Sequence, residues 1–132
     1  MNDGEGQRCV ALIVEDEWLI RMELADALAA AGVTVFEASA GEDALTYLQG
    51  DHPIHVLITD IRLVGTLSGW DIAEAFRTAR PDIAVIYASA NPPQEARQVP
   101  GSVFFAKPAP MQQLVQTCYQ LCPLMRGPSI GG

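Results

Sequence analysis

The sequence predicts an α/β fold, a doubly wound (βα)5 sandwich around a five-stranded parallel sheet. Two observations predict it. Short, continuous apolar runs alternate with amphipathic stretches along the chain, which is the pattern of βα units. Apolar residues make up 49% of the 132 residues and charged residues 18%, a balance and length that suit one compact core. We expect this domain to span residues 8–122, with flexible tails at 1–7 and 123–132.

Five apolar runs are expected to form the strands. The first, third and fourth are apolar nearly throughout, as in central strands that helices cover on both faces, whereas the other two are mixed and suit the edges. In chain order, the expected strands are Cys9–Val14, Val33–Glu37, Ile54–Thr59, Ile83–Ala88 and Ser102–Phe105.

The stretches between these strands predict helices. The first is expected over Glu17–Ala31, with Gly32 as its stop signal. The last begins near Pro110 and has apolar residues at helical spacing as far as Cys122. The segment Asn91–Gly101 between the fourth and fifth strands contains three prolines, so we expect a short fourth helix or an irregular loop there.

Two pairs of residues have the spacing of capping boxes. Ser39 precedes Glu42 by three residues, and Ser68 precedes Asp71 by the same interval. We therefore expect these serines to begin the second and third helices.

Composition disfavours several classes of function. The net charge of −8, without any basic run, repels a phosphate backbone, so we expect no direct binding of nucleic acid. The apolar stretches are too short to cross a membrane and the polar N-terminus does not resemble a signal peptide, so we expect a cytoplasmic protein. Cys9, Cys118 and Cys122 are odd in number and lack CxxC spacing, which indicates neither a disulfide framework nor a zinc site. We expect Cys118 and Cys122 to be small core residues.

Chemically active side chains follow the ends of four expected strands. Glu15 and Asp16 follow the first strand, Asp60 the third, Ser89 the fourth and Lys107 the fifth. Because ligands of open α/β sheets bind outside the carboxyl ends of the strands, we expect these groups to converge at one edge.

This set of groups fits phosphoryl transfer. Three neighbouring carboxylates repel one another unless a cation shares their site, and Mg²⁺ accepts carboxylates together with waters and a phosphate. Asp60 can serve as a nucleophile that forms an acyl phosphate. Lys107 and Ser89 can then contact the phosphoryl oxygens.

From about Arg8 to Leu121 the sequence resembles the receiver domain of two-component response regulators. All five signature positions of that family occur in order. The matching segments are LIVEDE (Leu12–Glu17), LITDIRL (Leu57–Leu63), SGWDIA (Ser68–Ala73), VIYASA (Val85–Ala90) and FFAKP (Phe104–Pro108). The resemblance implies a flavodoxin-like fold with strand order 2-1-3-4-5.

The resemblance also implies roles for the acidic residues. Asp60 would accept a phosphoryl group from the phosphohistidine of a histidine kinase or phosphotransfer protein. Asp16 and Asp60 would ligate Mg²⁺, Glu15 would orient it through water, and the backbone carbonyl of Arg62 would complete the protein ligands.

Four further positions carry roles in such domains. Ser89 and Lys107 would bind the attached phosphoryl group, and Ser89 with Phe104 would form the conformational switch. Arg62 and Asn91 would tune the lifetime of the acyl phosphate.

The sequence departs from the family pattern in three places. The loop Arg62–Gly69 is one residue longer than its commonest form, and Val64 stands where proline is frequent. The interval between Ser89 and Lys107 is short and rich in proline. Phe104 lacks the hydroxyl of the tyrosine that is more frequent there. The second and third departures bear on how a signal leaves the domain.

We therefore expect a phosphorylation-controlled switch that catalyses only its own Mg²⁺-dependent phosphorylation and dephosphorylation and turns over no external substrate. Only Leu124–Gly132 follows the last helix, so we expect output through contact with an unidentified protein or through phosphate relay. Alternatives are a phosphorylation-independent adaptor and a fragment of a larger hybrid kinase or regulator. A phosphatase would need a second aspartate where Arg62 stands. A flavin site would need a phosphate cradle where the first loop is acidic.

Overall fold

The computed structural model describes residues 8–50, 52–94 and 96–122, so the expected tails at 1–7 and 123–132 lie outside the described residues. The strands lie within two residues of their expected bounds. In chain order the elements are β1 (Val10–Val14), α2 (Trp18–Ala30), β2 (Thr34–Ala38), α3 (Gly41–Gln49), β3 (Val56–Thr59), α4 (Gly69–Ala79), β4 (Ala84–Ser89), β5 (Val103–Ala106) and α5 (Met111–Leu121).

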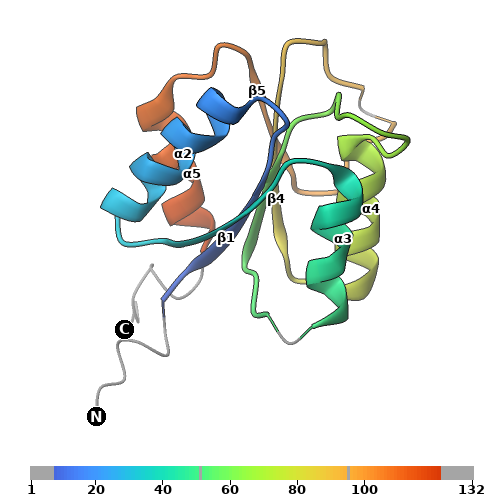
Figure 1. Cartoon of the computed structure of the whole chain (residues 1–132), viewed down its shortest axis with the longest axis horizontal. Coiled ribbons are helices and arrows are strands. Elements are labelled where there is room, and N and C mark those ends of the chain that lie inside the picture. Colours follow the sequence, from blue (N-terminus) through green and yellow to red (C-terminus); the bar gives the residue numbers. More distant parts are fainter. Residues whose placement is uncertain (1–7, 51, 95, 123–132) are drawn as a thin grey trace.

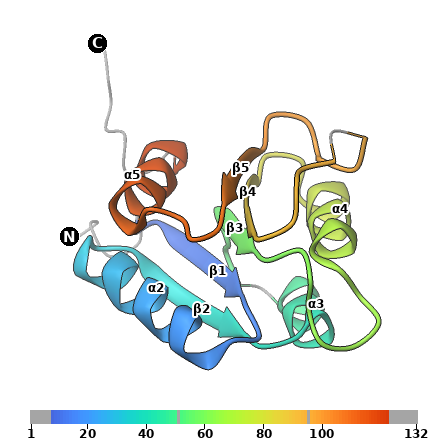
Figure 2. The same cartoon turned by 90° about the horizontal axis from the view of Figure 1, so that it is seen from above.

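The strands form one parallel sheet in the order β2-β1-β3-β4-β5, which confirms the order that the resemblance implied. Helices α2 and α5 cover one face of the sheet, and α3 and α4 cover the other (Figure 1). The view from above shows the same three layers (Figure 2). The predicted doubly wound α/β fold is therefore confirmed.

The alternation of side chains along β1 divides the core into two halves. Val10, Leu12 and Val14 pack on the side of α3 and α4, whereas Ala11 and Ile13 pack on the side of α2 and α5. All five are buried, as expected for a central strand between two helical layers.

One of the two expected capping boxes forms. Ser68 caps α4, where its hydroxyl accepts a hydrogen bond from the Asp71 amide and the Asp71 carboxylate accepts one from the Ser68 amide. The prediction for Ser39 was wrong, because α3 is capped by Ala40 without a side-chain hydrogen bond. The Glu42 carboxylate instead accepts a hydrogen bond from Thr66, across the loop that precedes α4.

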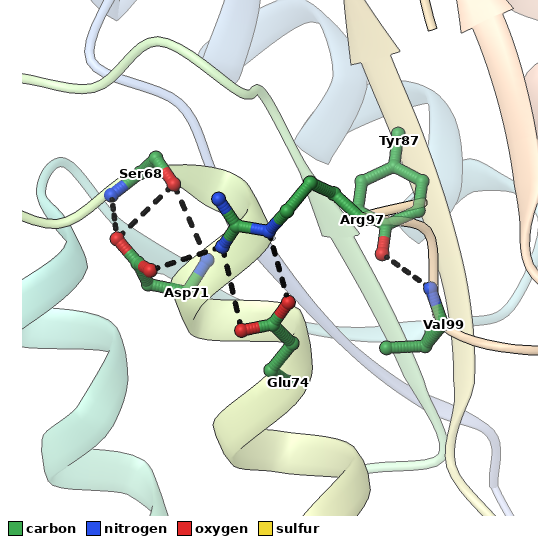
Figure 3. A network of polar contacts seen from close by, with 6 residues as sticks. All are labelled: Ser68, Asp71, Glu74, Tyr87, Arg97 and Val99. Carbon is green, nitrogen blue, oxygen red and sulfur yellow. Dashed lines mark hydrogen bonds and ion pairs between the residues drawn. The ribbon is translucent and has the colours of Figure 1, made fainter. Parts of the chain in front are cut away.

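The chain between β4 and β5 has no helix among its described residues, so of the two expected alternatives it forms the irregular loop. Side chains hold this segment in place (Figure 3). Arg97 pairs with Asp71 at 3.2 Å and with Glu74 at 3.1 Å, both on α4. The Tyr87 hydroxyl accepts a hydrogen bond of 3.1 Å from the Val99 amide. The segment is therefore fixed to α4 and β4 without a helix of its own.

The cysteine prediction needs a correction, because Cys9 and Cys122 form a disulfide. Cys118 and Cys122 are buried in the core as expected, but only Cys118 carries a free thiol. The spacing of the cysteines could not indicate this bond, because the two partners lie 113 positions apart in the sequence. The fold brings the start of β1 and the end of α5 to the same edge of the sheet (Figure 1).

Among the described residues, no helix has the length and apolar character that crossing a lipid bilayer requires.

Candidate functional site

The three acidic residues converge at the carboxyl edge of the sheet, as predicted. Glu15 follows β1 and Asp60 follows the adjacent β3, and the Asp60 amide donates a hydrogen bond of 3.0 Å to the Val14 carbonyl. Asp16 comes next in the chain after Glu15. One carboxylate oxygen from each of the three acids lies within 4.8 Å of the others.

Lys107 bridges two of these acids. Its Nζ lies 2.7 Å from Glu15 Oε1 and 2.9 Å from Asp60 Oδ2. The Lys107 amide donates to the carbonyl of Ser89, which holds the lysine at the end of the β4–β5 ladder. The side chains of Glu15, Asp60 and Lys107 are 6%, 11% and 17% exposed, so water screens these charges only weakly.

Burial and pairing oppose each other in this cluster. Burial raises the pKa of Glu15, although the hydrogen bonds from Lys107 and from the Glu17 amide act in the other direction. Burial also lowers the pKa of Lys107, but the hydrogen bonds and charges of Glu15 and Asp60 outweigh it, so the net shift of this pKa is upward. The lysine therefore stays charged and partly offsets the cost of burying the charge of Glu15.

Asp60 is held firmly by its own loop. The Ile61 amide donates to Asp60 Oδ1 at 2.6 Å, and the Thr59 hydroxyl donates to the Asp60 carbonyl at 2.7 Å. The N-terminus of α4 packs against the same backbone at Gly69. If this residue had a side chain, its Cβ atom would stand only 2.8 Å from the Asp60 carbonyl carbon. Only glycine fits this approach, so the start of α4 and the position of Asp60 depend on each other.

The two expected switch residues lie on neighbouring strands. Ser89 is buried, and its hydroxyl accepts a hydrogen bond of 3.1 Å from the Asn91 amide. Among the described residues, no hydrogen bond joins this hydroxyl to Asp60. Phe104 is partly buried, with its ring centroid 6.3 Å from that of Tyr87, which in turn lies 4.8 Å from the Trp70 ring.

Arg62 and Asn91 both line a polar cavity of about 530 Å³. The cavity runs between the loop after β3 and the segment after β4, and Ile61 continues its lining toward Asp60.

A family model for the response regulator receiver domain matches residues 11–119. The chain belongs to this family. The receiver domain is accordingly a module of two-component phosphorelay signalling.

Individual relatives agree with the family. The sensor kinase CckA of Brucella abortus (strain 2308) is 30% identical over 115 residues, which cover 83% of this chain and 12% of that protein. The receiver domain thus spans only a small part of this curated relative. A solved response regulator receiver protein from Sinorhizobium medicae WSM419 is 28% identical, with a TM-score of 0.82, and the match covers 87% of this chain and 94% of that one. The solved receiver domain of the hybrid histidine kinase CckA is also 28% identical, with a TM-score of 0.73 and coverages of 86% and 98%.

Arg21 is one part of this receiver domain's site that the sequence did not reveal. Its Nη1 donates to the Glu15 carbonyl at 2.7 Å, and its Nε pairs with Glu37 of β2 at 3.1 Å. The arginine therefore braces the turn that carries the first two acids. An arginine on the polar face of a helix gives no sequence signal for such a contact, because its partner is a backbone oxygen.

The donor set of the receiver domain suits a hard divalent cation. Glu15, Asp16 and Asp60 offer only oxygen ligands, which Mg²⁺ prefers, and Mg²⁺ needs one or two carboxylates beside its waters. Lys107 supplies a single positive charge against these three acids. The residues present therefore fit Mg²⁺, because the three acids carry more negative charge than Lys107 neutralises.

Proposed function

We propose that Asp60 accepts a phosphoryl group from the phosphohistidine of a histidine kinase or phosphotransfer protein, and that the phosphorylated domain is a switch for protein–protein output. The observation that carries this proposal is the placement of Asp60. Its carboxylate lies beside one fixed cation, Lys107, and within reach of two further acids, at the edge of the sheet where ligands of such folds bind.

The chemical step needs little from the protein beyond position and charge. A carboxylate oxygen of Asp60 attacks phosphorus in line with the departing imidazole nitrogen. A P–O bond forms and the P–N bond breaks, and its electron pair stays on the histidine, which takes up a proton from water. Each oxygen of Asp60 accepts one hydrogen bond, from Ile61 or Lys107, and so retains a lone pair for this attack.

Asp16, Asp60 and the backbone carbonyl of Arg62 would hold Mg²⁺, with Glu15 orienting it through water. The ion would supply charge neutralisation for the phosphoryl oxygens. Lys107 already stands 2.9 Å from Asp60 Oδ2, so it can transfer its hydrogen bond to a phosphoryl oxygen once the acyl phosphate forms.

Ser89 would connect this event to the rest of the domain. Its hydroxyl accepts from the Asn91 amide and keeps its own proton to donate, so a rotation of this hydroxyl toward the phosphoryl group would alter the start of the segment between β4 and β5. Phe104 would follow by repacking against Tyr87, and the signal would leave through packing rather than through a new tyrosyl hydrogen bond.

The proposal also covers the cellular compartment and the catalytic range of the domain. We place it in the cytoplasm, with catalysis limited to its own phosphorylation and dephosphorylation. The match to 12% of a sensor kinase supports the alternative that such a domain belongs to a larger hybrid protein.

The test is phosphorylation by a small donor. The chain is incubated with acetyl phosphate and Mg²⁺, and its intact mass is measured. We expect an increase of about 80 Da, the mass of one phosphoryl group, that does not form when EDTA is present from the start of the incubation. Asp60→Asn abolishes the increase, because an amide cannot form the acyl phosphate.

Asp82→Asn is the matched control, because Asp82 is an exposed aspartate on the loop before β4. This variant should gain the same mass as the unmodified chain. An adduct that survives in Asp60→Asn would contradict the assignment of the acceptor. Failure of the unmodified chain to gain mass would instead support the phosphorylation-independent adaptor.

A further inference from the structure

The disulfide between Cys9 and Cys122 lies at the edge of the sheet opposite the acidic site. Cys9 directly precedes β1, whereas Glu15 directly follows it. Cys122 is the C-cap of α5. The bond therefore joins the start of β1 to the end of α5. All five strands lie between the two cysteines in the sequence.

We propose that Cys9 and Cys122 are a reversible thiol–disulfide pair, which a small disulfide of the glutathione class oxidises and a thiol reduces within the folded protein. The closed pair pins the end of α5 to the sheet. The reduced pair leaves α5 attached through its other buried contacts.

The fold does not depend on the bond for its core. Both cysteines pack in the apolar cluster between the sheet and helices α2 and α5, where a thiol occupies nearly the same space as half of a disulfide. Leu114 and Cys118 bury the inner face of α5 in that cluster without taking part in the bond. Reduction therefore removes a cross-link and leaves the packing of the helix in place.

The neighbouring His55 raises the alternative of a metal site, because one ring nitrogen lies within 4.8 Å of both sulfurs. Two observations oppose it. The sulfurs are bonded to each other, so neither carries the thiolate charge that binds a metal. His55 Nδ1 accepts a hydrogen bond of 3.0 Å from the Val10 amide, which places the ring proton on Nε2 and leaves no free lone pair.

The two cysteines differ in how they can reach solvent. Cys9 is held in the sheet, where its carbonyl accepts a hydrogen bond of 2.8 Å from the Thr34 amide. Cys122 ends a helix, and its amide makes bonds of 3.2 and 3.3 Å to the carbonyls of Cys118 and Tyr119. Opening of this last turn requires only local fraying, so Cys122 is the sulfur that meets an external reagent.

The exchange then runs in two balanced steps. The Cys122 thiolate attacks the small disulfide, forming a mixed disulfide and releasing one thiolate, which takes up a proton. When the turn closes, Cys9 loses its proton to water and attacks the Cys122 sulfur, expelling the second small thiolate, which is protonated in turn. Two protein thiols are oxidised, and one small disulfide becomes two thiols.

Native-state thiol counting tests the proposal. The folded chain is equilibrated with oxidised glutathione, or with excess reduced glutathione, and then denatured, alkylated and weighed. We expect one alkylated cysteine after oxidation and three after reduction, with conversion in both directions in the absence of denaturant. Peptide mapping should assign the single free thiol to Cys118, since burial raises the pKa of that thiol to about 12 and keeps it unreactive.

Thermal unfolding gives a second readout. Because the bond closes a loop of more than a hundred residues, the oxidised chain should melt about 15–20 °C higher than the reduced chain. Cys118→Ser is the control and should keep this difference, whereas Cys122→Ser should lose it. Comparison of the two states of the unmodified chain does not depend on how well any variant folds.

Three results would overturn the proposal. They are three free thiols after oxidation, a disulfide that involves Cys118, or a bond that resists reduction until the protein is unfolded. Stoichiometric binding of Zn²⁺ by the reduced chain would assign the cluster to metal instead. The gain of mass at Asp60 is measured separately, so failure of this proposal leaves the phosphorylation test unaffected.

Discussion

Lys107 shows how a single side chain organises the site. Its ammonium lies between Glu15 and Asp60, and it comes from the far end of the chain, after β5. Removing one member of a buried ion pair leaves its partner uncompensated, which typically costs about 3–5 kcal/mol of stability. The lysine thus pairs with Asp60 in the resting domain and is placed to bind the group that Asp60 would accept.

The raised pKa of Glu15 predicts how stability depends on pH without divalent ions. Above its ordinary value of 4.5, the unfolded chain has released this proton while the folded chain still holds it. The contribution of Glu15 to stability is therefore present below that value and is lost as the pH rises through the raised pKa. We expect Glu15→Gln to gain stability relative to the unmodified chain over this interval. Urea unfolding of both proteins in EDTA at several pH values measures the difference, and a difference independent of pH would contradict burial of the Glu15 carboxylate as its cause.

The sequence could predict this site because each acid follows an apolar run whose end marks the edge of the sheet. Glu15, Asp16 and Asp60 meet as expected. The sequence could not predict the resting partner of Ser89, the amide of Asn91, because a hydroxyl that is suited to bind a phosphoryl group is equally suited to a local turn.

At the scale of elements, α4 is the support of the site. Gly69 lets its first turn approach the Asp60 backbone, and the Gly69 amide donates to the Ile61 carbonyl at 2.8 Å. The same helix binds Arg97 through Asp71 and Glu74, so it also anchors the segment that follows β4 (Figure 3). The two loops around the polar cavity are therefore fixed to one helix.

The two serines that share a capping pattern should differ in their effect on stability. Ser68 accepts a hydrogen bond from the Asp71 amide, so Ser68→Ala should cost about 1 kcal/mol of unfolding free energy. Ser39 makes no cap, and Ser39→Ala should change stability by less than about 0.5 kcal/mol. Urea unfolding at neutral pH measures both. Equal losses in the two variants would contradict the assignment of the caps.

The cap of α3 was predicted wrongly for a physical reason. A capping box needs both side chains to reach the backbone, and the Glu42 carboxylate has a competing donor in Thr66, which only the folded loop supplies. The prolines between β4 and β5 act locally, by removing amide donors, and so they predicted the irregular segment correctly.

At the scale of the whole molecule, the topology decides which distant residues meet. The strand order followed from the family resemblance, since the apolar runs fix where strands lie but not their neighbours. The same topology joins Cys9 to Cys122, and no local pattern contains that information. Where the family resemblance supplied the topology, distant partners such as Lys107 and Glu15 were predicted to meet, whereas the disulfide had no such support.

The net charge of −8 and the cluster of three acids together predict that Mg²⁺ stabilises the folded chain. A ligand that binds only the folded state adds RT ln(1 + [L]/Kd), about 2.7 kcal/mol at a hundredfold excess over Kd, which corresponds to a rise in Tm of about 10 °C. Beryllofluoride, as a mimic of the phosphoryl group, should raise the Tm further. Asp16→Ala should abolish the response to Mg²⁺, whereas Asp82→Ala, which removes an exposed acid outside the cluster, should retain it. Differential scanning calorimetry at fixed ionic strength makes the comparison, because general screening of the negative charge would then stabilise every variant equally. An equal response in Asp16→Ala and Asp82→Ala would assign the effect to screening and remove the support for a metal site.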